Sequence, residues 1–151
     1  MKIPGLIFLI IFKSFLGSDD FVDPTGTYIL KAEVKNHRIV GHSGEIRVKL
    51  LDRTHLAISF YINKGFPNYE SGAFMDTLLY KENIARYQPV SDPQCNVLIL
   101  FSSGKAEIQQ VYSDPTCHCG FGDGILVSTY FVKSSGEMPI IQDLSGHGKT
   151  S

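Results

Sequence analysis

The feature that most constrains the fold of this chain is an alternation of apolar and polar residues with a period of two. Side chains along a β-strand point alternately to its two faces, so this pattern is typical of a strand with one buried face. The segment 55–63 shows it clearly, with Leu56, Ile58, Phe60 and Ile62 at every second position. No convincing amphipathic helix of about ten or more residues accompanies these segments. The sequence therefore predicts an all-β protein.

Eight segments carry strand patterns and are separated by short turns. They are 27–35, 45–50, 55–63, 72–80, 83–87, 94–102, 105–112 and 125–133. The connections through Leu51 to Thr54 and through Ser103-Gly104 are short enough for hairpins. Eight such strands favour an antiparallel up-and-down meander that closes into a small barrel, and a curved β-sandwich is the alternative.

The beginning of the chain has the parts of a secretory signal. Lys2 precedes an uncharged run from Ile3 to Phe12, and the small residues Gly17 and Ser18 follow. The run is too short to span a bilayer, and an uncleaved anchor or a buried strand is the alternative. We expect an exported protein, periplasmic or extracellular, with no stable membrane span after cleavage. The predicted parts are a signal peptide 1–18, a leader 19–25, a β-barrel domain 26–133 and a polar flexible tail 134–151.

The charges of the chain are balanced and mixed along its length. It has 14 Lys+Arg against 15 Asp+Glu. Nucleic-acid binding requires clustered lysine and arginine to displace counterions from phosphates, so no nucleic-acid partner is expected. No carboxylate pair or nucleophile with an orienting partner is apparent either. We therefore predict a protein that is not an enzyme and that needs no cofactor.

The three cysteines are Cys95, Cys117 and Cys119. In an exported protein they are expected to oxidise where geometry allows. The hairpin around Ser103-Gly104 places Cys95 at its open end, and the chain after residue 112 can fold back, so either Cys117 or Cys119 can reach Cys95. Such a bridge contributes about 3 kcal/mol in the chain-entropy model. A Cys117–Cys119 bridge is a minor alternative because so small a ring is strained. One thiol is left over.

The segment 117–124, Cys-His-Cys-Gly-Phe-Gly-Asp-Gly, is the most conspicuous loop. Cysteine and histidine suit zinc or Cu(I), but three consecutive side chains point in opposing directions, so no metal site is predicted. Gly120 and Gly122 permit a sharp turn, and Phe121 is expected to anchor that turn against the barrel end. With His118, these residues form a candidate binding loop.

A second candidate contact loop is Phe66-Pro67-Asn68-Tyr69, between the third and fourth predicted strands. Solvent-facing aromatic residues mark interfaces, whereas buried ones close cores. Phe66 and Tyr69 therefore either form an exposed contact surface or act as a lid over one end of the barrel.

The chain also resembles a group of small secreted bacterial β-barrel proteins of uncharacterised function. The resemblance rests on Gly26-Thr27-Tyr28, Ala85-Arg86-Tyr87, Cys95, Cys119-Gly120-Phe121-Gly122 and a final strand with Tyr130 and Lys133, and it spans about residues 25–133. It departs from the group at Ser128, where a glycine is expected, and at the extra Cys117. The resemblance implies that Cys119 is the partner of Cys95.

Three functions are compatible with these observations. The first is a protein-binding module, an inhibitor or immunity-type factor that acts through the rigid loop and is similar in build to periplasmic lysozyme inhibitors. The second is a carrier of a small apolar ligand, because eight-stranded barrels can hold one. The third is a redox or metal protein that uses the unpaired cysteine. We favour the first, with another protein as the partner.

Overall fold

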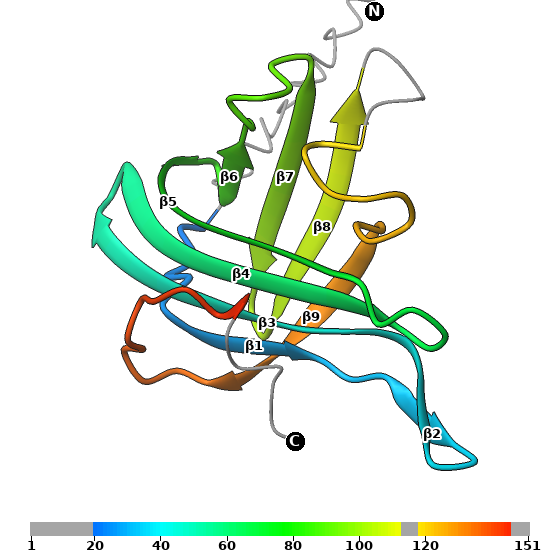
Figure 1. Cartoon of the computed structure of the whole chain (residues 1–151). Helices are drawn as coiled ribbons and strands as arrows, with labels where there is room; N and C mark the ends of the chain where they lie inside the picture. The colour runs from blue at the N-terminus through cyan, green and yellow to red at the C-terminus, as the bar shows by residue number, and fades with distance from the viewer. Residues whose placement is uncertain (1–19, 113–117, 146–151) are drawn as a thin grey trace, which may run out of the picture.

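The computed structural model describes residues 20–112 and 118–145, so the predicted signal peptide lies outside the described residues. The described residues contain no α-helix, and thus no helix long and apolar enough to cross a membrane. Their strands are β1 (Gly26–Leu30), β2 (Glu33–Lys35), β3 (Arg38–Asp52), β4 (His55–Gly65), β5 (Ser71–Lys81), β6 (Ile84–Tyr87), β7 (Cys95–Ser102), β8 (Lys105–Tyr112) and β9 (Thr129–Ser135) (Figure 1).

Eight of these strands close into an antiparallel barrel. The sheet runs in the order β1, β9, β8, β7, β6, β5, β4, β3, and β1 also pairs with β3, which closes the ring. Closure satisfies the backbone groups that would otherwise line two open edges. The predicted eight-stranded up-and-down barrel is therefore confirmed, and the curved sandwich is not formed.

The barrel interior is filled by the side chains that the alternation predicted. Leu56, Ile58, Phe60 and Ile62 on β4 are all fully buried. Burial of each such side chain contributes about 1.5–3 kcal/mol. The ring of Phe60 lies 4.9 Å from that of Phe74 on β5 and 5.9 Å from that of Phe131 on β9. The middle of the barrel is thus occupied by aromatic and branched side chains from several strands.

The first predicted strand, 27–35, is divided in the structure. β1 ends at Leu30, and β2 pairs only with the beginning of β3 in a hairpin that projects from the barrel (Figure 1). Asn36 and His37 form its turn, with φ angles of 50° and 60°, as a two-residue type I′ turn requires. Val34, which the alternation placed on the buried face, is 73% exposed because this hairpin stands away from the barrel (Figure 1).

The last predicted strand, 125–133, also differs from the observed β9. Ile125 and Leu126 are both buried, which is a turn pattern and not an alternating one. The Ile125 amide donates to the Gly122 carbonyl oxygen, at 3.2 Å. β9 therefore begins at Thr129 and runs two residues beyond the predicted end of the barrel domain.

The predicted leader closes one end of the barrel, which we call the leader end. The Tyr80 hydroxyl donates to the Val22 carbonyl oxygen at 2.7 Å, and the Val22 amide donates to Oδ1 of Asn83 at 2.9 Å. The Tyr28 hydroxyl donates to the Pro24 carbonyl oxygen at 2.9 Å. Burial raises the pKa of Tyr80 to about 12. The leader is therefore part of the fold.

Part of the predicted polar tail lies against the outside of the barrel. Ser135 still belongs to β9, and the chain then returns across β3 and β4. The Gln142 amide donates to Oγ of Ser59 at 2.9 Å, and Nη1 of Arg47 donates to the Ile140 carbonyl oxygen at 3.4 Å. Ser59 is fully buried and Leu144 is 2% exposed. The segment up to residue 145 is thus fixed at several points.

Candidate functional site

The disulfide lies at the end of the barrel opposite the leader, which we call the loop end. Cys95 opens β7 and is bridged to Cys119, with their Cα atoms 5.1 Å apart. Both residues are buried. Nε2 of Gln110 on β8 lies 3.8 Å from Sγ of Cys119, as a weak donor. The bridge that the resemblance implied is therefore confirmed. Cys117 lies outside the described residues.

The segment after the bridge folds over the loop end. Cys119 and Gly120 have φ angles of 53° and 77°, so the chain turns sharply, and the Phe121 amide donates to the His118 carbonyl oxygen at 2.9 Å. The Phe121 ring packs at 6.0 Å from Phe60 and 6.4 Å from Phe74, between ring centroids. Phe121 is thus the anchor that the sequence predicted. It faces the core.

Two further contacts hold this segment against the barrel wall. Nε2 of His42 on β3 donates to the Gly124 carbonyl oxygen at 2.8 Å, and Nζ of Lys64 on β4 donates to the Asp123 carbonyl oxygen at 3.4 Å. Gly122 and His118 are exposed at its surface. Of the predicted binding loop, His118, Gly120 and Gly122 therefore face solvent, and Phe121 does not.

The Phe66–Tyr69 loop carries two exposed aromatic side chains. Phe66 is 42% and Tyr69 is 44% exposed, and their rings pack against each other at 6.4 Å. The guanidinium of Arg38, at the beginning of β3, lies 4.5 Å from the centre of the Phe66 ring. Two exposed rings with a guanidinium against one of them are consistent with the expected contact loop.

The backbone of this loop is held by hydrogen bonds on several sides. The Phe66 amide donates to the Ile39 carbonyl oxygen at 2.8 Å, and the Tyr69 amide donates to the Gly65 carbonyl oxygen at 2.9 Å. Nδ2 of Asn63 donates to the Tyr69 carbonyl oxygen at 2.7 Å. The aromatic rings are therefore presented from a fixed backbone.

The disulfide segment and the aromatic loop are linked through the side chain of Lys64. Lys64, which reaches the Asp123 carbonyl oxygen, also forms an ion pair with Glu70, the residue after Tyr69. A single lysine thus connects the two loops. We use the name loop surface for Arg38, Phe66 and Tyr69 together with His118.

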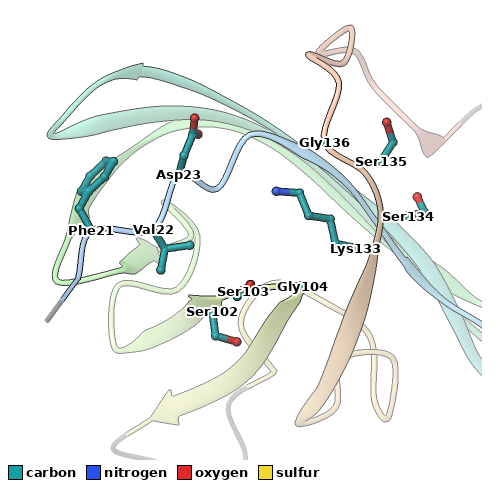
Figure 2. Close-up of a pocket in the computed structure, with 10 residues that line it drawn as sticks. All are labelled: Phe21, Val22, Asp23, Ser102, Ser103, Gly104, Lys133, Ser134, Ser135 and Gly136. Carbon is teal, nitrogen blue, oxygen red and sulfur yellow. The ribbon is translucent and has the colours of Figure 1, made fainter.

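A hollow of about 640 Å³ lies at the leader end (Figure 2). Its walls are the leader at 21–23, the β7–β8 turn at 102–104 and the end of β9 at 133–136. Figure 2 shows the Lys133 side chain extending into its centre, with Asp23 on the leader across from it. Burial raises the pKa of Tyr28 beneath this hollow, and the neighbouring Tyr80 and the charge of Asp23 raise it further.

Sequence reasoning did not identify Lys133 or Arg38 as site residues. A signal for Lys133 was present, because in an alternating strand it falls on the same face as the buried Phe131. A lysine on the inward face at a strand end points into the barrel mouth. Arg38 had no such signal, because its position over Phe66 depends on a loop that is distant in sequence.

The described residues also bear on the other two candidate functions. Four hollows at their surface are lined mainly by residues of the barrel ends and outer wall, with Tyr80 and Cys119 among the buried residues that they reach, whereas Leu56, Ile58, Phe60 and Ile62 fill the barrel interior. Among the same residues, no group of three or more histidine, cysteine, aspartate or glutamate side chains is placed to hold a metal ion.

Over residues 20–112 and 118–145, the fold and these surfaces define a closed, end-capped β-barrel with one extra strand and a disulfide. No protein-family model, curated protein or solved structure matches this chain.

Proposed function

We propose that the protein is an exported, non-enzymatic protein-binding module of the inhibitor or immunity type, and that the loop surface contacts its partner. The observation that carries the proposal is the exposed pair of Phe66 and Tyr69 with the Arg38 guanidinium against it, on a hydrogen-bonded backbone. Aromatic residues and arginine are enriched at the centres of protein interfaces.

The fixed backbone supports this reading on energetic grounds. A loop that is already ordered loses less conformational entropy when it docks than a flexible loop does. The disulfide at Cys95 and Cys119 and the Lys64 contacts hold the neighbouring segment in the same way. Export is supported by the disulfide, since such bridges persist in oxidising compartments, and by the uncharged run near the start of the chain.

The test compares a loop-surface variant with a matched variant on the barrel wall. Tyr130 is 53% exposed and has the ammonium of Lys105 at 4.9 Å from its ring, so it is a second exposed aromatic–cation pair away from the loop end. Phe66→Ala with Tyr69→Ala is compared with Lys105→Ala with Tyr130→Ala in affinity capture of periplasmic or extracellular proteins, read by quantitative mass spectrometry.

We expect a partner that the wild type and the wall variant retain and that the loop-surface variant loses by about 30-fold or more in affinity, as for interface hot spots. Lysozyme is the first partner to assay, by the stoichiometric slowing of cell-wall lysis. Unchanged lysis at a large excess of protein eliminates the lysozyme version. Equal loss of a partner in both variants contradicts the assignment of the loop surface.

A further inference from the structure

The hollow at the leader end is lined by Lys133, whose ammonium group lies over an aromatic ring. Lys133 is partly buried, and its ammonium lies 5.5 Å from the centre of the Tyr28 ring. Within the described ranges, Lys133 forms no ion pair with a carboxylate. The ammonium group of Lys133 keeps its full positive charge at the hollow, so an anionic group that enters is attracted to it.

Asp23 provides the opposite charge on the facing wall (Figure 2). Its Oδ1 accepts a hydrogen bond from the Thr25 amide at 3.0 Å, which fixes the carboxylate on the leader. Asp23 and Lys133 therefore line the same hollow without forming an ion pair with each other. An occupant with a single negative charge is attracted by Lys133 and repelled by Asp23, whereas an occupant with both charges suits both walls.

The hydroxyl groups of the two serines that follow Lys133 form hydrogen bonds within the protein. Oγ of Ser134 donates to the Thr27 carbonyl oxygen at 3.2 Å, and Oγ of Ser135 accepts from the Glu137 amide at 3.1 Å. The two charged side chains, with the hydroxyl groups of Ser102 and Ser103 on the β7–β8 turn, are therefore the polar groups that an occupant meets. Their wall segments are fixed, since the Lys133 amide donates to the Gly104 carbonyl oxygen at 2.9 Å.

We infer that this hollow binds a small zwitterion, a molecule with a carboxylate for Lys133 and an ammonium group for Asp23, of the size of a dipeptide. The volume of about 640 Å³ is in the range of small-molecule sites. This inference does not depend on the proposed function, because the hollow and the loop surface lie at opposite ends of the barrel.

The experiment titrates L-alanyl-L-alanine into ¹⁵N-labelled full-length protein and follows the amide resonances of 102–104 and 133–136. Two capped forms separate the charges: N-acetyl-alanyl-alanine lacks the ammonium group, and alanyl-alanine amide lacks the carboxylate. The zwitterion is expected to give saturable shifts at these amides. Each capped form is expected to bind about tenfold or more weakly, because one charged contact is lost.

Two variants and one control test the residues. Lys133→Met keeps an unbranched stem against Tyr28 and removes the charge, and Asp23→Asn removes the facing charge. Each is expected to weaken binding of the zwitterion by about tenfold or more. Lys105→Met removes a lysine that lies over a different tyrosine, Tyr130, outside the hollow, and is expected to leave binding unchanged. Melting temperatures confirm that all three variants are folded.

Three results overturn the inference. The first is the absence of a saturable shift with the zwitterion through the millimolar range. The second is equal binding of the zwitterion and either capped form, which would mean that one of the two charges is not recognised. The third is undiminished binding by folded Lys133→Met protein. None of these results bears on partner capture by the loop surface, so the two proposals fail separately.

Discussion

Replacement of Gly72 by alanine tests whether the disulfide segment closes the loop end as described. Gly72 on β5 pairs with Ile62 and faces the interior. A Cβ atom there would lie 2.0 Å from Cδ1 and 2.6 Å from Cε1 of Phe121. The backbone of Gly72 is not in the left-handed region, so the cost is steric. Displacement of a packed ring to admit one methyl group costs about 1–3 kcal/mol.

The same structure predicts that a second substitution relieves the first. Phe121→Ala alone removes a partly buried ring from Phe60 and Phe74 and is expected to cost about 2–3 kcal/mol, below the loss for a fully buried phenylalanine. In the double variant the alanine at position 72 meets no ring. The two losses are therefore expected to fall short of additivity by about 1–2 kcal/mol.

The assay is urea unfolding with the disulfide kept oxidised. The chain has no tryptophan, so far-UV circular dichroism and tyrosine fluorescence report the transition. Gly136→Ala is the matched control, because a Cβ at Gly136 meets no atom within 4 Å, and a change of no more than about 0.5 kcal/mol is expected. Equal destabilisation by Gly72→Ala in the presence and absence of the Phe121 ring would refute the packing.

Three further predictions concern the rest of the fold. Removal of the bridge by Cys95→Ala with Cys119→Ala is expected to lower the free energy of unfolding by about 3–4 kcal/mol, because the linked residues are 24 positions apart. Urea unfolding measures this loss, and an unchanged free energy of unfolding contradicts the prediction. Folding raises the pKa of Tyr80 to about 12, so the contribution of this hydroxyl to stability is fully present below the pKa of the unfolded chain, near 10, and is lost as the pH rises toward 12. A melting temperature that stays constant over this pH interval would disprove the prediction. Ser59→Ala removes the acceptor of the Gln142 amide and is expected to cost about 1 kcal/mol and to speed proteolysis of the tail; unchanged cleavage argues against the contact.

The inward face of the barrel was predictable because burial there follows directly from alternation. Leu56, Ile58, Phe60 and Ile62 needed only the period of two and a neighbouring strand on each side. Val34 carries the same local pattern and is exposed, because its strand leaves the barrel after Leu30. Whether an apolar face is covered depends on elements distant in sequence, which a local pattern does not encode.

In the candidate sites, too, local residue types were predictable from the sequence, whereas contacts between distant segments were not. The residue types of Phe66, Tyr69 and His118 made them candidate contact residues, with a lid over the barrel as the alternative for Phe66 and Tyr69, and the glycines around Phe121 correctly indicated a turn anchored on that ring. The partner of Phe66 was not predictable, because Arg38 reaches it only through the pairing of β3 with the β4–β5 loop. The hollow around Lys133 likewise exists only because the leader, one turn and the end of β9 meet there.

The packed interior has a consequence for how the two ends act together. β3 runs from Arg38 at the loop surface to the turn where Arg53 covers Phe21 of the leader, and its 15 residues correspond to roughly 45 Å of extended chain. Among the described residues, Arg38 lies against Phe66 and not against the residues that line the hollow, and between the two ends lies a core of fully buried, close-packed side chains. Substitutions at Arg38 and at Lys133 should therefore add in their effects on stability, and occupancy of the hollow should leave partner affinity at the loop surface unchanged. Coupling between the ends would require the barrel wall to adopt a second arrangement, and the complete ring of strand pairings opposes such a change.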